Sequence, residues 1–215
     1  MYNIIAAFSI YLLLSRVSSI SDLLIVSRDD WNAKPPTLVE PMANPVPYVI
    51  IHHSYQPGAC NTQEDCIRAM QSMQQYHQVE RGWNDIGYSF AVGGDNRAYV
   101  GRGWSAVGAH APKYNTRSIG ICVIGDWRED LPPSSQLQTV KDLIQYGVEH
   151  GKIAKDYILF GHRQVRETEC PGDALFNEIQ KWPHWEPNPS ISPQNTNNVN
   201  SGANSISVKR NRLLN

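Results

Sequence analysis

Three continuous apolar runs constrain the fold of this chain most. They are PYVIIHH, which ends at His53, SIGICVIG, which begins at Ser118, and YILFGHR, which begins at Tyr157. Apolar runs of this length without polar alternation are typical of strands that are covered on both faces of a sheet. The segments GYSFAVGG and RAYVGRG add two further strands, and GGDN at their junction predicts a hairpin turn.

Helical patterns separate these runs. Residues 62–78 begin with Thr62, which can cap a helix, and carry acidic residues in the first turn. Residues 132–151 combine an early proline, apolar residues at helical spacing and a glycine after the last turn. A shorter helix is predicted at residues 172–182. Strands that alternate with helices, together with one hairpin, predict an α/β fold with a central mixed β-sheet flanked by helices.

The two ends of the chain differ from the part between them. Apolar residues 4–14 are fewer than the roughly 20 that span a bilayer, and they have the length of the apolar region of a signal peptide. We therefore predict a signal peptide at residues 1–21 and a secreted protein, although no Lys or Arg precedes the apolar stretch; a buried strand or an uncleaved anchor are the alternatives. Residues 22–186 are predicted to form one domain. Residues 187–215, rich in Asn, Ser and Pro, are predicted to be a disordered polar tail.

The charge of the chain is nearly balanced, with 19 basic and 20 acidic residues. This balance lacks the basic excess with which proteins bind nucleic acid, so we expect no nucleic-acid partner. We also expect a monomer. No stable insertion into a membrane is expected, because no apolar segment has the necessary length.

The four cysteines fall into three groups. Cys60 and Cys66, in CNTQEDC, close a small loop and are predicted to form a disulfide in an oxidising compartment. Cys122 lies inside the apolar run SIGICVIG and is predicted to be a buried free thiol. Cys170 has no evident partner, so its presence needs a separate reason.

Histidines near Cys170 supply a candidate reason. The runs VIIHH and ILFGH both end in histidine, and sites of α/β proteins lie where the carboxyl ends of parallel strands meet. One histidine of the pair His52 and His53 can then join His162 and Cys170 around a zinc ion, because adjacent strand side chains point to opposite faces. Zinc prefers nitrogen and sulfur ligands in a tetrahedron and, in catalytic sites, leaves the fourth position to water.

Alternatives to this zinc site also follow from the residues. His162 can be a hydrogen-bonded structural histidine and Cys170 a small buried apolar residue. Cys170 can instead be a nucleophile that His162 activates, as in thiol hydrolases. Other histidines compete as zinc ligands: His77, His110, His150 and His184.

Several motifs that occur in order along the chain point to one protein family. They are VIIHHS, MQQYHQVERGWNDIGYSFAVGGD, VGRGW, GAHAPKYNTRSIGI, VIGDW and FGHRQVRETECPGDALFNEIQKWPHW. Between Ser27 and Trp185 the chain resembles the peptidoglycan recognition proteins, the animal branch of the zinc N-acetylmuramoyl-L-alanine amidases. The resemblance implies a single domain of the amidase type, with a zinc ion in a surface cleft. By position, it implies that His52, His162 and Cys170 are the zinc ligands.

The resemblance also implies a reaction on bacterial peptidoglycan and muropeptides. The amidases hydrolyse the amide bond between the lactyl group of N-acetylmuramic acid and L-alanine. Tyr88 matches the catalytic tyrosine, and Thr168 matches a position beside the zinc that phage-type members fill with lysine. Members that only bind peptidoglycan usually have serine in place of Cys170, so the cysteine favours a working amidase that scavenges fragments and dampens innate immune signalling. The alternative is a non-catalytic receptor that binds fragments and signals through a partner.

The resemblance predicts the type of peptidoglycan as well. Gly82 and Trp83 match the pair that is associated with diaminopimelate-type stems. Arg102 matches the arginine that binds the additional carboxylate of diaminopimelate, a group that a guanidinium can grip with two hydrogen bonds. Further positions match residues that contact sugar and peptide: His53, Ser54, His77, His110 and Asn115. Cys60 and Cys66 match the disulfide common to the family, whereas the second disulfide of its longer members has no cysteines here.

Overall fold

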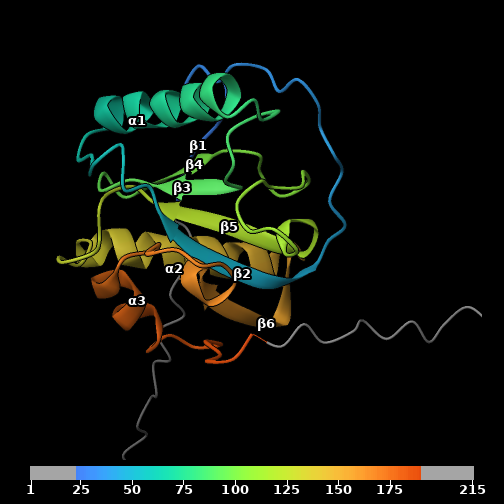
Figure 1. Cartoon of the computed structure of the whole chain (residues 1–215), viewed down its shortest axis with the longest axis vertical. Helices are drawn as coiled ribbons and strands as arrows, with labels where there is room; N and C mark the ends of the chain where they lie inside the picture. The colour runs from blue at the N-terminus through green and yellow to red at the C-terminus, as the bar shows by residue number, and fades with distance from the viewer. Residues whose placement is uncertain (1–22, 190–215) are drawn as a thin grey trace, which may run out of the picture.

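The fold is an α/β structure built on one mixed sheet, as the sequence predicts. The computed structural model describes residues 23–189. Its sheet has six strands in the order β1-β4-β3-β5-β2-β6 (Figure 1). The strands have these bounds: β1 Leu24–Val26, β2 Val46–His53, β3 Phe90–Val92, β4 Arg97–Val100, β5 Ser118–Val123 and β6 Ile153–Gly161.

Parallel pairing dominates the sheet. Strands β3 and β4 are antiparallel and form the predicted hairpin, whereas the other neighbouring strands run parallel. β2 lies between β5 and β6, and its Ile51 pairs with Ile121 on one side and Gly161 on the other. The carboxyl ends of β2, β5 and β6 therefore meet at one edge. Strand β1 was not predicted, because Leu24 and Ile25 are exposed at the edge of the sheet and carry no burial pattern.

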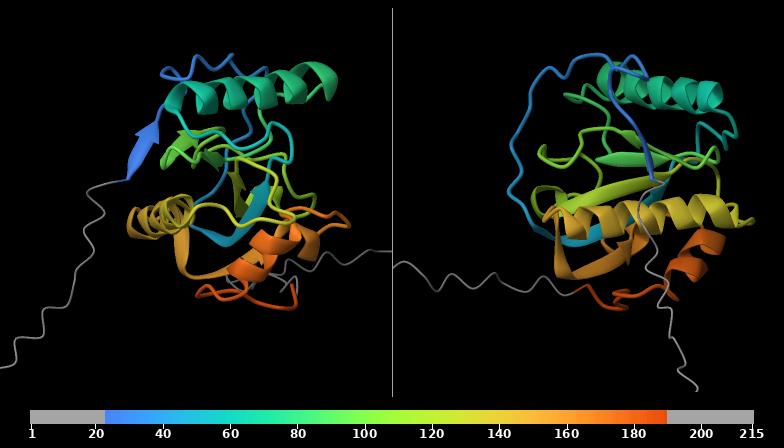
Figure 2. Two further views of the ribbon diagram at one scale, coloured as in Figure 1. Left: turned by 90° about the vertical axis from the view of Figure 1, so that its left-hand side faces the viewer. Right: turned by 180° about the vertical axis from the view of Figure 1, so that it is seen from behind.

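Helices cover both faces of the sheet, as predicted (Figures 1 and 2). Helix α1, Gln63–Gln75, lies on one face, where its Met70 belongs to a buried apolar cluster with residues of the central strands. Helix α2, Ser134–Glu149, lies on the other face, where its Leu143 belongs to a second and larger cluster. The short helix α3, Asp173–Ile179, packs beside β6 on the same side as α2.

Helix α1 begins as the sequence predicts but ends differently. The Thr62 hydroxyl accepts a hydrogen bond from the amide of Asp65, with 3.2 Å between oxygen and nitrogen. The α-helical geometry stops at Gln75, and the predicted helix continues as a wider π-helical turn, η2, at Tyr76–Glu80. This turn contains His77, which is buried, so the widened backbone places a histidine beneath the surface at the end of the helix.

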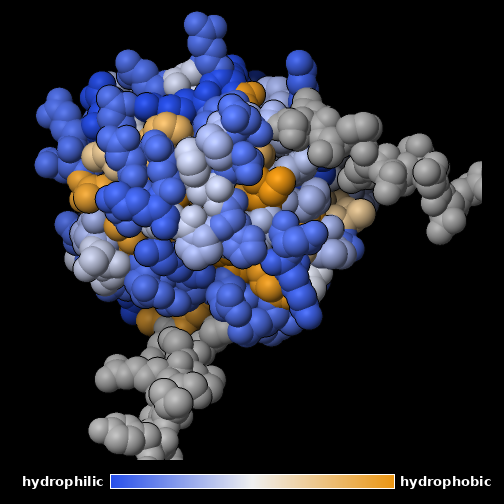
Figure 3. Space-filling view, turned by 90° about the horizontal axis from the view of Figure 1, so that it is seen from below, coloured by the Kyte–Doolittle hydropathy of each residue, from blue (hydrophilic) through white to orange (hydrophobic). Residues whose placement is uncertain are grey.

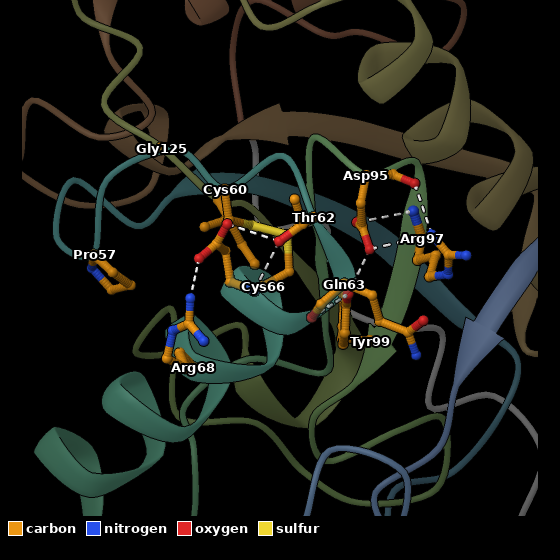
Figure 4. The surroundings of a disulfide bond; sticks show 12 residues. Pro57, Cys60, Thr62, Gln63, Cys66, Arg68, Asp95, Arg97, Tyr99 and Gly125 are labelled. Carbon is orange, nitrogen blue, oxygen red and sulfur yellow. Dashed lines mark hydrogen bonds and ion pairs between the residues drawn. A yellow bond between two sulfur atoms is a disulfide. The ribbon is translucent and has the colours of Figure 1, made fainter.

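Cys60 and Cys66 form the predicted disulfide, and Cys122 is the predicted buried free thiol. The disulfide joins the segment before α1 to the first part of that helix (Figure 4). The amide of Gly94 donates to the carbonyl of Cys60 at 2.9 Å, so the β3–β4 turn packs against the disulfide loop. A Cβ atom at Gly93 would lie 2.5 Å from the Cys66 sulfur, which explains why this turn needs a glycine.

The face seen from below is mainly hydrophilic, with separate small hydrophobic areas (Figure 3). Within residues 23–189, no helix combines the length and the apolar composition that crossing a membrane requires. The predicted signal peptide at residues 1–21 and nearly all of the predicted tail at residues 187–215 lie outside the described residues.

Candidate metal centre

Two histidines meet where β2 and β6 end. Because Ile51 of β2 pairs with Gly161 of β6, the next residue of each segment, His52 and His162, lies at the same edge of the sheet. Their ring centroids are 4.3 Å apart. The sequence predicts this meeting, because both apolar runs end in histidine and parallel strands share one carboxyl edge.

Cys170 reaches the two histidines through the loop that follows β6. That loop begins with a short 3₁₀ turn, η4, at His162–Gln164. The amide of Arg163 donates to the carbonyl of Cys170 at 2.9 Å, which folds the loop back on itself. One ligand atom each of His52, His162 and Cys170 lies within 4.8 Å of the other two. In the part of the chain that the structure describes, these three residues form the candidate metal-binding group.

The donor atoms of this group fit a zinc ion. The sulfur of Cys170 lies 3.8 Å from Nδ1 of His52. Two ligands of a tetrahedral zinc ion at usual bond lengths are about 3.5 Å apart, so only a small adjustment is needed. Both ring nitrogens of His162 are buried and have no hydrogen-bond partner, a costly state that a metal bond would relieve at one of the two. Two nitrogens and one sulfur are also the ligand types that zinc prefers.

Burial keeps both imidazoles neutral, as metal ligands must be. It lowers the pKa of His162 to about 4, with the charge of Arg166 acting in the same direction. Burial, reinforced by the neighbouring histidines, also places the pKa of His52 well below its usual value. The pKa of the Cys170 thiol is raised to about 12 by burial. Although the charge of Arg163 acts against this shift, the thiol stays protonated at neutral pH in the metal-free protein, so a thiolate at this position would need a bound cation.

His53 faces the opposite side of β2 from His52. Its Nδ1 accepts a hydrogen bond from the amide of Trp127 at 3.3 Å and lies 4.0 Å from a carboxylate oxygen of Asp126. Burial lowers the pKa of His53 to about 4, although Asp126 acts against this shift. The main-chain amide of His53, by contrast, donates to the Cys170 sulfur at 3.4 Å. The sequence assigns His53 to substrate contact, and in the structure its backbone supports the candidate metal centre.

Two neighbouring hollows form a groove beside the three candidate ligands. The first encloses about 300 Å³ and the second about 540 Å³, and His77 and Tyr88 line both. The first hollow is lined by His52, His77, Trp83, Tyr88, Ala109, His110, Pro112, Asn115, His162 and Arg166. The second is lined by Ser54, Tyr55, Gln56, Pro57, Ser72, Met73, Tyr76, His77 and Tyr88. Two of the three candidate ligands, His52 and His162, thus line one part of an extended groove.

Tyr88 lies at the junction of the two hollows. Its ring centroid is 5.3 Å from that of His52 and 5.7 Å from that of His77. Burial raises the pKa of Tyr88 well above its usual value, and the Cys122 and Cys170 thiols add to the shift. The hydroxyl therefore keeps its proton at neutral pH, and a hydrogen bond to the Cys122 thiol contributes to this effect.

Two stacked rings, those of Trp83 and His77, form an aromatic wall next to Tyr88. The ring of Trp83 stacks on that of His77, with 4.7 Å between centroids and 15° between planes. Nδ1 of His77 accepts a hydrogen bond from the amide of Gly87 at 3.1 Å, which holds the imidazole in place. The preceding Gly82 has a φ of 65°, a conformation that favours glycine. The predicted pair of Gly82 and Trp83 therefore builds one side of the groove.

Arg102 lies in a different place from the three candidate ligands. It lines a separate hollow of about 120 Å³, together with Asp85 and Val107. Its guanidinium donates to the main-chain carbonyls of Asp85, Ile86 and Val107. Three of its five N–H donors are thus used within the protein. Its charge nevertheless helps to lower the pKa of His77, so Arg102 is near the groove but outside the hollows described above.

Three other predicted site residues hold loops with their side-chain oxygens. The Thr168 hydroxyl accepts from the amide of Cys170 at 3.2 Å. The Ser54 hydroxyl accepts from the amide of Gly125 at 2.8 Å and donates to the carbonyl of Pro57. The carboxamide oxygen of Asn115 accepts two main-chain amides, at 2.9 and 2.8 Å. Each of these contacts fixes a segment that borders the groove.

The sequence left several groove residues without a role. Arg166, four positions after His162, lines the first hollow and brings a positive charge to it. Tyr55 and Tyr76 line the second hollow and are 48% and 51% exposed. The sequence did carry signals for these residues. Arg166 follows His162 in the same loop, Tyr55 follows the HHS motif, and Tyr76 directly precedes His77. All four competing histidines lie outside the candidate metal group: His77, His110, His150 and His184.

Acidification is expected to destabilise the zinc-free protein. Burial lowers the pKa values of His53, His77 and His162 to about 4, whereas an exposed histidine titrates near 6.5. Between these values the unfolded chain binds more protons than the folded chain, so stability present above pH 6.5 is lost as the pH falls toward 4. Each histidine contributes about 1.4 kcal/mol per pH unit in this range.

Urea unfolding of chelator-treated protein at pH 7 and pH 5 measures this loss. We expect the free energy of unfolding to fall by at least about 2 kcal/mol between the two pH values. An unchanged free energy would mean that these histidines take up protons as readily in the folded chain as in the unfolded chain. Saturation with zinc serves as the control, because an ion on His162 competes with its proton and stabilises the folded chain.

Comparison with known proteins agrees with the fold and identifies the family. A family model described as N-acetylmuramoyl-L-alanine amidase matches residues 42–173, so the chain belongs to this amidase family. Within it, the relatives place the chain among the peptidoglycan recognition proteins. Peptidoglycan-recognition protein LB of Drosophila melanogaster is 57% identical over 161 residues, which cover 75% of this chain and 69% of the relative. An N-acetylmuramoyl-L-alanine amidase of Mus musculus is 44% identical over 161 residues, which cover 72% of this chain and 30% of the relative.

Solved structures of relatives share the fold and include complexes. A mutant of Drosophila PGRP-LB in complex with tracheal cytotoxin is 56% identical, with a TM-score of 0.75, and the match covers 75% of this chain and 96% of that one. Peptidoglycan recognition protein LE in complex with tracheal cytotoxin, described as monomeric diaminopimelic acid-type peptidoglycan, is 42% identical, with a TM-score of 0.74. That match covers 75% of this chain and 95% of the other.

Proposed function

We propose that the protein is a zinc-dependent N-acetylmuramoyl-L-alanine amidase that hydrolyses the bond between the lactyl group and L-alanine of peptidoglycan. The observation that carries the proposal is the convergence of His52, His162 and Cys170, with both ring nitrogens of His162 buried and unpartnered. Binding alone does not require a set of two nitrogens and one sulfur beside the groove. Membership in the amidase family supports the same reaction.

The residues around the centre have separate roles in this proposal. A zinc ion on the three ligands would polarise the substrate carbonyl and lower the pKa of a coordinated water. Tyr88, which keeps its proton at neutral pH, donates a hydrogen bond to the oxygen that develops negative charge. Thr168 holds the loop of Cys170 through the amide of that residue. Thr168 is uncharged, so it takes over the positioning but not the charge of the lysine in phage-type enzymes.

We further propose that diaminopimelate-type fragments are the preferred substrates. Structures of two relatives, 56% and 42% identical to this chain, are complexes with tracheal cytotoxin. In the second structure this ligand is described as monomeric diaminopimelic acid-type peptidoglycan. Trp83 and His77 form a stacked wall for the stem peptide. Arg102 lies near this wall and keeps two N–H donors after its three main-chain hydrogen bonds, enough for a carboxylate.

Metal removal and readdition test the proposed reaction. Purified protein is incubated with a diaminopimelate-type muropeptide, and the freed stem peptide is measured by mass spectrometry. We expect release that EDTA abolishes and that zinc restores. Release that persists in EDTA would favour the thiol mechanism instead. Tight binding without release at full zinc occupancy would overturn the proposal and favour a receptor that binds fragments and signals through a partner.

The biological setting follows from the reaction. Cleavage separates the stem peptide from the sugar, so it destroys the fragment that a receptor of the same family would bind. We propose that the protein is secreted, acts as a monomer and, by scavenging fragments, dampens innate immune signalling. The Cys60–Cys66 disulfide supports an extracellular location, because such bonds persist in oxidising compartments.

A further inference from the structure

A series of hydrogen bonds runs from the candidate metal centre into the protein. Nε2 of His52 lies 3.0 Å from Nδ1 of His110, and Nε2 of His110 lies 3.4 Å from the hydroxyl oxygen of Ser118. That hydroxyl donates to the main-chain carbonyl of Tyr114, with 2.8 Å between the oxygens. The three side chains that form the series are all buried.

The carbonyl of Tyr114 sets the direction of every bond in this series. A carbonyl only accepts, so it takes the single hydroxyl proton of Ser118. The Ser118 oxygen then accepts from Nε2–H of His110, which leaves Nδ1 of His110 as an acceptor. That nitrogen accepts from Nε2–H of His52. The remaining nitrogen of His52, Nδ1, therefore carries a lone pair, and it is the atom that lies 3.8 Å from the Cys170 sulfur.

Two glycines leave the space that the ring of His110 occupies in this series. A Cβ atom at Gly120 would lie 2.5 Å from Cγ of His110, and a Cβ atom at Gly108 would lie 2.5 Å from Cδ2. Any side chain at either position would displace the ring. The carboxamide of Asn115 also holds the amide of His110 at 2.9 Å. The ring of His110 therefore has the space it needs to contact both His52 and Ser118.

We infer that His110 and Ser118 are positioning residues that fix the tautomer of His52 and direct its Nδ1 lone pair toward the metal ion. The inference deepens the proposed function and rests on it. Both ring nitrogens of His110 have protein partners, so its positioning role is exerted through His52. Such partners of metal-binding histidines typically change metal affinity or activity by about 10- to 100-fold when they are removed.

Nitrogen-15 NMR of histidine-labelled, zinc-free protein at neutral pH tests the tautomer directly. We expect the proton of His52 on Nε2, coupled through the hydrogen bond to Nδ1 of His110. A proton on Nδ1 of His52 would overturn the inference. This measurement uses the unaltered protein, so it does not depend on whether a variant folds. A protein that shows the expected tautomer but cleaves no muropeptide would contradict the proposed reaction and support the positioning role.

Two substitutions at position 110 separate positioning from packing. His110→Leu removes both nitrogens, whereas His110→Asn keeps an oxygen near the place of Nδ1 that can accept from His52. We expect zinc affinity, measured by chelator competition, to fall at least about 10-fold in His110→Leu and to recover at least partly in His110→Asn. Equal affinities in the two variants would overturn the inference. His150→Leu, at the end of α2, is the control and should leave zinc affinity unchanged.

Discussion

Cys170→Ser is expected to abolish muropeptide hydrolysis and to leave muropeptide binding nearly unchanged. Serine has almost the same size, so the loop that folds back through Arg163 should survive. A neutral hydroxyl is a poor zinc ligand compared with a thiolate, so zinc affinity should fall by more than about 100-fold. Hydrolysis should fall by at least about 10³-fold, because the metal is lost. Binding should persist, because the groove remains.

Metal content, single-turnover cleavage and calorimetric binding on the same preparation check this result. Cys122→Ala is the matched control, because Cys122 is the other free cysteine of residues 23–189 and lies outside the candidate metal group. It should retain a full equivalent of zinc. Full zinc occupancy and normal cleavage in Cys170→Ser would exclude Cys170 both as a ligand and as a nucleophile.

Tyr88→Phe is expected to lower kcat by about 10²- to 10³-fold while zinc content and KM stay close to those of the unaltered protein. The substitution removes one hydroxyl that burial keeps protonated beside the candidate ligands. Phenylalanine preserves the ring and its contacts with the rings of His52 and His77. The loss should therefore be specific to the step in which negative charge develops.

Steady-state kinetics on a diaminopimelate-type muropeptide measure the effect of Tyr88→Phe. Tyr76→Phe provides the matched control, because Tyr76 lines the second hollow and is about half exposed. It should leave kcat within about threefold of the unaltered protein, since an exposed hydroxyl is solvated in every state. If Tyr88→Phe were equally active, the hydroxyl of Tyr88 would have no part in the reaction.

The central part of the fold and the meeting of two histidines could be predicted from the sequence. Apolar runs that end in His53 and shortly before His162 are local signals, and parallel strands bring their carboxyl ends together whatever the loops between them do. Alternation along β2 also predicts that His52 and His53 face opposite sides. Each of these signals lies within a single strand, and parallel pairing then brings the two strand ends together.

Other features depend on contacts between distant segments, so the sequence alone did not reveal them. The role of Ser118 requires the main-chain carbonyl of Tyr114 to stand beside it. The bonds of Arg102 to three carbonyls require the segment of Asp85 and Ile86 to lie beside the residues that follow β4. Strand β1 pairs with β4 through its backbone, and its Leu24 and Ile25 are exposed. No side-chain pattern therefore predicts this strand.

The separation of the candidate ligands along the chain has a consequence for how the protein acquires zinc. His52 and Cys170 are 118 positions apart, so an unfolded chain offers no preformed tetrahedron. An ion that binds only after β2 and β6 have paired stabilises the folded state of the whole domain. Each tenfold rise of free zinc above its dissociation constant would add about 1.4 kcal/mol of resistance to unfolding. At low zinc concentration the protein would therefore be easier to unfold as well as inactive.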